Sequence, residues 1–163
     1  MNEFYMEQLV PRKVAEVKAA MIKNIILALT VVMFIGSFMI ALCFPIAVVL
    51  VVVDIFLMKS TNVEYEYMYL NGDLDIDKVI AKQKRKHLYS VSMSDVVVIA
   101  PKNSGEVRPF QNAKTLDYSS GVDSDKVYKM VVSKDNQNVG ILIEPNEALL
   151  NGMKMLAPRK VYI

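Results

Sequence analysis

The side chains that could do chemistry are few in this chain of 163 residues. It has one histidine, His87, and one cysteine, Cys43, so multi-histidine metal sites and intrachain disulfides are excluded. Ser94 and Asp95 are the nearest catalytic partners for His87 along the sequence, and no glycine-rich phosphate loop accompanies them. Because catalysis needs a nucleophile, a base and an orienting group in one place, we expect a protein without catalytic residues, metal or cofactor.

An acidic triplet, Asp73-x-Asp75-x-Asp77, has the spacing that opens a calcium-binding EF-hand loop. The sixth position of that loop needs glycine and the twelfth needs glutamate, but Lys78 and Lys84 stand there. Alternation along a β-strand also explains the triplet, as a face exposed to solvent. We therefore expect no calcium site.

The densest basic cluster consists of Lys82, Lys84, Arg85 and Lys86, with His87 next to it. Near an anionic lipid surface each such residue contributes about 1 kcal/mol, so lipid headgroup or protein-partner contact is one interpretation. The other is a solvated loop or strand edge that the acidic triplet balances. Nucleic acid is not expected as a partner, because the net charge is only +2 and few aromatic residues interrupt the cluster.

The sequence has two apolar runs, residues 25–42 and 44–58. The only ionisable side chains there are Cys43, which lies between the runs, and Asp54, which lies within the second. One helix over both runs would be about 51 Å long, more than the ~30 Å of a bilayer core. Pro45 suits a turn or the start of a second helix. The pattern predicts a transmembrane helical hairpin with short legs of about 25 Å, or alternatively a re-entrant hairpin.

Basic residues flank these runs and predict the orientation of the hairpin. Four precede the first run and one follows the second: Arg12, Lys13, Lys18, Lys23 and Lys59. The positive-inside rule then predicts an integral protein of the cell membrane, with two spans and both termini in the cytoplasm.

Asp54 is the one carboxylate inside an apolar run, and intramembrane carboxylates are costly enough to suggest function. We expect it to lie near the membrane interface or to pair with Lys23 across the hairpin. An ion or proton pathway and an oligomer contact remain alternatives.

Residues 64–79 predict a β-hairpin, since Asn71-Gly72 separates two alternating segments. A two-residue turn places Tyr69 opposite Leu74, Tyr67 opposite Ile76 and Tyr65 opposite Lys78. It also places Met68 opposite Asp75 and Glu66 opposite Asp77, so that one face is apolar and the other acidic.

The remaining sequence predicts more strands, a loop and a helix. Strands are expected at Leu88–Val91, Val96–Ala100, Val127–Ser133 and Val139–Glu144, with a turn over residues 134–138 and a mobile or weakly structured excursion over residues 101–126. An amphipathic helix follows Pro145 and ends before Pro158. The predicted fold is α+β. An N-terminal arm and hairpin form residues 1–60, and an antiparallel β domain with a C-terminal helix forms residues 61–163.

This order of elements resembles the membrane-anchored bacterial pleckstrin-homology-like proteins, in which case the β domain would be a split barrel. The stretches TNVEYEYMYLNGDLDIDKVIAKQKRK and EPNEALLNGMKMLAPRKVY are also similar to a family of small two-helix membrane proteins from anaerobic Gram-positive bacteria. Neither resemblance implies an activity or supplies functional residues.

Three functions follow from these features. The first is a membrane-tethered, non-catalytic module that binds a protein or an anionic lipid at the inner leaflet. The second is a small accessory subunit of a larger membrane complex, with the helical hairpin as its interface. The third, a membrane-anchored enzyme, is the least supported because the chain lacks convergent catalytic residues.

Overall fold

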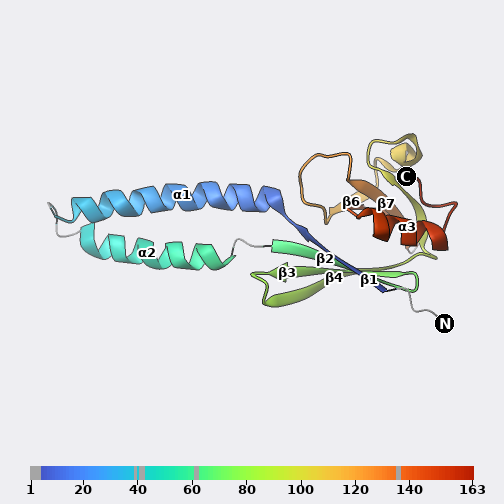
Figure 1. Ribbon diagram of the computed structural model, residues 1–163. Helices are drawn as coiled ribbons and strands as arrows, with labels where there is room; N and C mark the ends of the chain where they lie inside the picture. Colours follow the sequence, from blue (N-terminus) through green and yellow to red (C-terminus); the bar gives the residue numbers. More distant parts are fainter. Residues whose placement is uncertain (1–4, 39, 41–42, 61–62, 135–136) are drawn as a thin grey trace.

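The computed structural model describes residues 5–38, 40, 43–60, 63–134 and 137–163. It shows a helical hairpin that projects from a body of two β-sheets and a C-terminal helix (Figure 1). The elements in chain order are β1 (Tyr5–Pro11), α1 (Lys13–Gly36), α2 (Cys43–Ser60), β2 (Val63–Leu70), β3 (Asp73–Ile80), β4 (Lys84–Ser92), β5 (Val96–Pro101), the 3-10 helix η1 (Gly105–Phe110), β6 (Lys114–Asp117), β7 (Tyr128–Lys134), β8 (Gln137–Ile143) and α3 (Glu147–Leu156). The predicted α+β class is confirmed.

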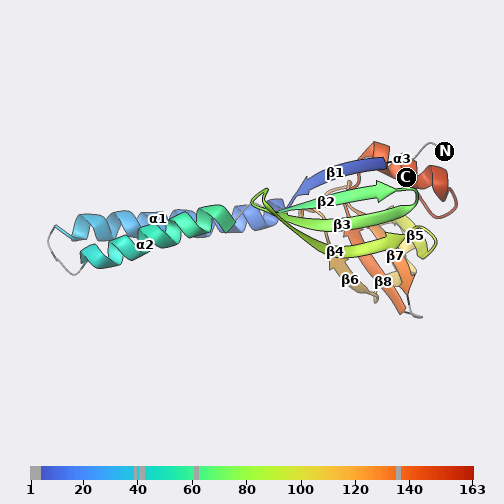
Figure 2. The same ribbon diagram turned by 90° about the horizontal axis from the view of Figure 1, so that it is seen from below.

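The core lies between the two sheets and α3. The first sheet has the antiparallel order β1-β2-β3-β4 (Figure 2), and the second has the order β5-β7-β8-β6, in which β6 runs parallel to β8. The largest fully buried side chains come from both sheets and from the helix: Tyr67, Tyr69, Leu74, Ile76, Ile99, Met130, Ile141, Ile143, Leu149 and Met153. The alternating pattern of β2 and β3 therefore serves the core as predicted.

β1 makes the N-terminal segment part of the first sheet. It pairs antiparallel with β2, from Tyr5 opposite Leu70 to Pro11 opposite Glu64, and Val10 is buried in the core. The helical hairpin is thus an insertion between two neighbouring strands. The first sheet takes β1 from before the predicted division between residues 60 and 61, and β2, β3 and β4 from after it.

Arg12 fixes the point at which the hairpin leaves the sheets. Its backbone N–H donates to the carbonyl of Val63 at 2.9 Å, so the two ends of the insertion are joined. Its guanidinium donates to the Tyr65 hydroxyl at 2.9 Å, to the Asp117 carbonyl at 2.8 Å and to Asp117 Oδ2 at 3.2 Å. It also lies 5.5 Å from the centre of the Tyr65 ring, within cation–π range.

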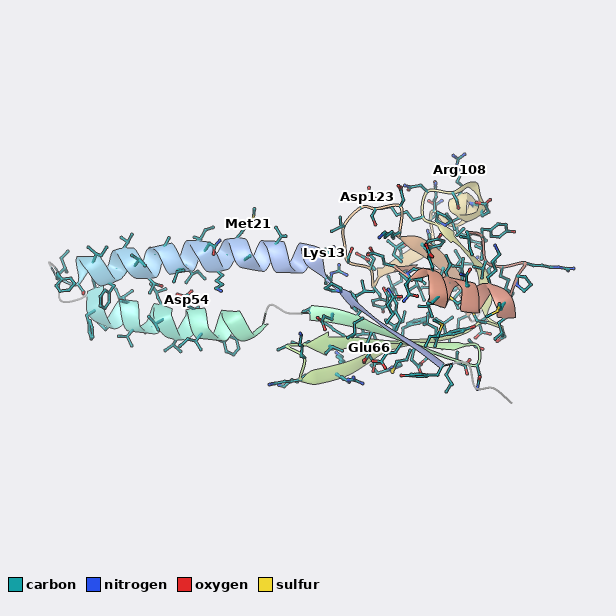
Figure 3. All side chains as sticks on the ribbon, in the orientation of Figure 1. Lys13, Met21, Asp54, Glu66, Arg108 and Asp123 are labelled. Carbon is teal, nitrogen blue, oxygen red and sulfur yellow. The ribbon has the colours of Figure 1, made fainter. Side chains whose placement is uncertain are left out.

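The two helices meet along a narrow seam with heptad spacing. The buried and half-buried positions recur every three or four residues, as in a coiled coil: Ile26, Thr30 and Met33 in α1, and Cys43, Ala47, Leu50 and Asp54 in α2. Most other large apolar side chains point outward. Met21 is 62% exposed and Phe56 is 73% exposed, and Figure 3 shows Met21 on the side of α1 away from α2.

The predicted transmembrane location is wrong. Among the helices of the described residues, none combines the length and the apolar character that crossing a membrane requires. The physical reason is that α2, with 18 residues, is about 27 Å long against a bilayer core of ~30 Å. In α1 the first half carries Lys13, Lys18 and Lys23, which leaves a shorter uncharged half.

The segment 101–126 is more ordered than predicted. It contains η1 and the strand β6, which pairs with β8 from Lys114 opposite Val139 to Asp117 opposite Leu142. Val107 of η1 is buried against the outer face of β5 and β7. Phe110 also packs there. The loop-forming residues around Val107 and Phe110 obscured these apolar anchors, so the expectation of a mobile or weakly structured excursion was wrong.

The other predicted elements correspond to observed ones. The four strands predicted after residue 87 overlap β4, β5, β7 and β8, while residues 135 and 136 of the predicted turn lie outside the described residues. The predicted helix is α3, whose Asn146 side chain accepts from the Leu149 N–H at 2.8 Å. This is the N-cap that its sequence position indicates.

The β2–β3 turn gives a first testable prediction. Asn71 and Gly72 have φ values of 51° and 104°, and a Cβ on Gly72 would lie 3.2 Å from Leu156 Cδ2. We expect Gly72→Ala to lower the free energy of unfolding by about 1–2 kcal/mol, since an L side chain is strained there. Gly105→Ala is the control, because nothing lies within 4 Å of its Cβ position. Equal losses in urea unfolding would contradict the prediction.

Arg12 gives a second prediction. Its contacts are partly buried, whereas the Lys102–Asp123 pair has its carboxylate 80% exposed. We expect Arg12→Ala to lower the unfolding free energy by about 1.5–3 kcal/mol, and Lys102→Ala by less than about 1 kcal/mol. Arg12→Lys should restore only part of the loss, because lysine cannot reproduce the planar fork. Full restoration by lysine would show that charge alone matters.

Candidate functional site

Polar side chains gather on the outer face of the first sheet. β2 and β3 pair with Tyr69 opposite Leu74, Tyr67 opposite Ile76 and Tyr65 opposite Lys78 on one face, and with Met68 opposite Asp75 and Glu66 opposite Asp77 on the other. All five predicted pairs are confirmed. The acidic residues of both strands therefore share the face that points away from the core.

The acidic triplet Asp73, Asp75 and Asp77 lies on that outer face of β3. Within the described residues, no three histidine, cysteine or acidic side chains are placed to hold a metal ion. Asp75 and Asp77 instead form hydrogen bonds with side chains of β4.

Glu66 is a carboxylate buried on the outer face. Its side chain is 1% exposed, and Oε1 accepts from Arg85 Nη2 at 2.9 Å while Arg85 itself remains 62% exposed. Burial, and then contact with the Glu7 carboxyl of β1, raise the pKa of Glu66 above its ordinary value of 4.5, and the charge of Arg85 opposes this. Arg85, one of the four predicted basic contact residues, is thus used inside the molecule. Figure 3 labels Glu66 on the first sheet.

His87 and Ser90 of β4 connect Asp77 and Asp75 of the triplet in one hydrogen-bonded network. His87 Nδ1 lies 2.8 Å from Asp77 Oδ1, and His87 Nε2 lies 3.1 Å from Ser90 Oγ. Ser90 Oγ in turn donates to Asp75 Oδ1 at 2.5 Å. An Asp–His–Ser sequence of contacts is the arrangement by which catalytic triads are recognised.

Proton positions argue against a triad. The Ser90 hydroxyl has a single proton, which it donates to Asp75 Oδ1. That proton is therefore not directed at His87 Nε2, as activation of a serine nucleophile by histidine requires. The group is also exposed on an open sheet face. It is a hydrogen-bonded surface network, and its geometry does not activate a nucleophile.

Sequence reasoning missed this network because of a β-bulge. The register shifts between Ile76 and Asp77, so Tyr89 faces Ile76 but His87 faces Asp77. Without the extra residue His87 would face Lys78 on the inner side. The Ser94–Asp95 pair considered in the sequence is not part of the network: Ser94 Oγ lies 3.1 Å from Ser92 Oγ and 3.2 Å from Asp95 Oδ1.

The other predicted basic residues lie at the edge of the first sheet. Lys82 is in the β3–β4 turn, where Ala81 and Lys82 have φ values of 51° and 56°. Lys84 and Lys86 are exposed on β4, which is the last strand of its sheet. Within the described residues, these three lysines form no ion pair, in contrast to Arg85. The structure therefore places the four predicted basic residues close together along the chain, but only Arg85 forms an ion pair within the described residues.

Asp54 and Lys23 are not brought together. Asp54 is 8% exposed in the hairpin seam, and its Oδ2 lies 3.0 Å from Thr30 Oγ1, which also lies 2.9 Å from the Ile26 carbonyl oxygen. Figure 3 shows the Asp54 label between the two helices. Among the described side chains Lys23 has no ion pair with Asp54. The Asp54 carboxylate is therefore part of the contact between α1 and α2. Because the predicted membrane spans are wrong, the interpretation of Asp54 as an intramembrane carboxylate no longer applies.

Comparison with known proteins identifies the family. The family described as a bacterial PH-like domain (DUF6106) matches residues 2–163. This chain belongs to that family. The match includes β1 and the hairpin, so the PH-like domain extends over nearly the whole chain. No curated protein and no solved structure matches it. The resemblance to pleckstrin-homology-like proteins is confirmed, and the membrane anchor that accompanied it is not.

The buried carboxylate of the PH-like domain gives a third prediction. With the pKa of Glu66 raised in the folded state, the folded protein binds more protons than the unfolded chain just above pH 4.5, so stability falls as pH rises through that window. We expect wild type to lose stability relative to Glu66→Gln as pH rises from 4 to 7. Thermal unfolding across this range measures the difference.

Nearby charges require a control for this pH dependence. Glu7, Asp77 and Arg85 face Glu66, and the pKa of Glu7 is lowered, first by its hydrogen bond with Tyr5. Glu7→Gln should therefore not reproduce the effect of Glu66→Gln. A difference between wild type and Glu66→Gln that stays constant with pH would contradict the assignment to Glu66.

Proposed function

We propose that this protein is a non-catalytic binding module, and that the edge of β4 with Lys82, Lys84 and Lys86 takes an acidic, extended segment of a protein partner. A PH-like domain suggests a binding module. The observation that carries the proposal is the open edge of β4, the last strand of the first sheet, lined by lysines that form no ion pair within the described residues.

An open strand edge offers unpaired backbone groups to another strand. Among the described strands, β4 pairs only with β3, so one row of its N–H and C=O groups remains available for strand addition. Basic residues and a bulge at an edge also discourage pairing between identical chains. Two β4 strands would bring like charges together, whereas an acidic strand is attracted, so the same residues favour one partner and disfavour another.

The backbone of the β3–β4 turn supports a role for Lys82. Two successive residues without glycine, Ala81 and Lys82, adopt left-handed conformations, which cost of order 1 kcal/mol or more each. An Asn-Gly pair would be less strained there, as in the β2–β3 turn. This strain is retained beside lysines that form no ion pair within the described residues, which supports selection for binding over stability.

Peptide binding tests the proposal. The probes are fluorescein-labelled ten-residue peptides that alternate Glu or Asp with Val, Thr or Tyr, titrated with the full chain in fluorescence anisotropy. We expect replacement of Lys82, Lys84 and Lys86 by Ala to weaken binding at least tenfold. Replacement of Lys114, Lys126 and Lys134, three exposed lysines outside the first sheet, should leave binding within twofold because the charge change is equal but distant.

Two further measurements separate strand addition from simple charge attraction. N-methylation of alternate peptide residues removes backbone donors, and binding should then fall although the charge is unchanged. Substituting Asn-Gly for Ala81-Lys82 should raise stability and weaken binding. If no acidic peptide binds, or if phosphatidylserine vesicles bind through the same lysines while the peptides do not, the proposal is wrong.

A further inference from the structure

The hairpin exposes apolar side chains on all sides. The seam between α1 and α2 uses one narrow stripe of each helix, and outward residues such as Ile25, Phe34 and Val52 are more than half exposed. An apolar surface of this extent marks a contact site, because patches beyond a few hundred Å² are rare on free monomers. Helices that are apolar all round are covered by other structure.

We propose that a second copy of this chain covers one flank of the hairpin, so that two hairpins form a parallel four-helix bundle. The seam divides the outward surface of the hairpin into two flanks, and the proposed interface is one of them. In an antiparallel pair of helices, the residues just after the seam positions of both helices lie on the same side. This flank consists of Leu27, Val31, Phe34, Phe44, Val48 and Val51, each 45–56% exposed.

The area of this flank suits a dimer. Six half-exposed side chains with the adjoining backbone offer on the order of 600 Å² per copy, so a two-fold pair buries roughly 1,200 Å², the lower end of stable interfaces. A two-fold axis makes the same patch complementary to itself. None of the six side chains is charged, so no charge on the flank opposes an identical partner.

Charge along the hairpin selects the parallel arrangement. Lys13, Lys18 and Lys23 lie in the half of α1 nearer the sheets, whereas residues 24–36 of α1 and residues 43–53 of α2 are without acidic or basic residues. An antiparallel pair would place the lysines of one copy against the apolar tip of the other. A parallel pair places the two apolar tips side by side and keeps the lysines of both copies at the end of the hairpin near the sheets.

Sedimentation equilibrium of the full chain tests the proposal. We expect a dimer whose association strengthens with salt, because the lysines of the two copies repel each other. Phe34→Glu with Val51→Glu should give a monomer with unchanged circular dichroism. Leu29→Glu with Val53→Glu, on the opposite flank of the same helices and 45% and 38% exposed, should remain dimeric.

Cys43 reports the orientation, since it is the only cysteine and lies at the hairpin tip. A short bismaleimide should cross-link two wild-type chains, and the Phe34→Glu, Val51→Glu variant should not be cross-linked. A monomeric wild type overturns the proposal, as does loss of the dimer in both variant pairs or in neither. Flotation with phosphatidylglycerol vesicles, or a stable complex with a foreign protein, without self-association would also overturn it.

Discussion

The contacts of Arg12 tie together the three parts of this molecule. Its backbone joins the beginning of α1 to the beginning of β2, and its guanidinium reaches Asp117, the last residue of β6. The hairpin therefore leaves the sheets from a fixed point, between two strands that are hydrogen-bonded to each other. Arg12 is half-buried, and its planar guanidinium makes several hydrogen bonds at once, so the sheets hold the start of the hairpin in place.

Strand β4 and the turn before it contain both charges that stabilise the fold and charges that remain exposed. Arg85 neutralises the buried carboxylate of Glu66, and His87 links Asp77 to Ser90 and Asp75. Removal of one of these partners would leave a desolvated charge, which costs more than the pair contributes. Lys84 and Lys86 stand opposite Ile80 and Lys78, on the other side of β4, and Lys82 lies in the β3–β4 turn. All three are exposed. A cluster that looks uniform in sequence is thus divided in the folded protein.

Local patterns predicted much of this fold, whereas features that depend on distant residues were missed. Asn71-Gly72 defined the β2–β3 register completely, and the spacing of apolar residues located α3. β1 was missed because its partner β2 follows about 50 residues later, across the hairpin, so no local pattern reports the pairing. The bulge that turns His87 outward is equally invisible to a period-two pattern. The apolar runs correctly indicated two helices with exposed apolar side chains. Composition alone does not say what such side chains contact. The membrane interpretation failed because the helices are too short to match the thickness of a bilayer.

The insertion of the hairpin between β1 and β2 also bears on how the chain folds. Strands that pair across a long flexible loop lose considerable entropy when the loop closes. Helices form from local contacts within about a microsecond, so a hairpin that forms early would bring Arg12 and Val63 near each other before β1 and β2 pair. The long loop would then behave as a short one, and β1 would need no long search for β2. The hairpin would thus act as an internal guide that lowers the effective contact order of the first sheet.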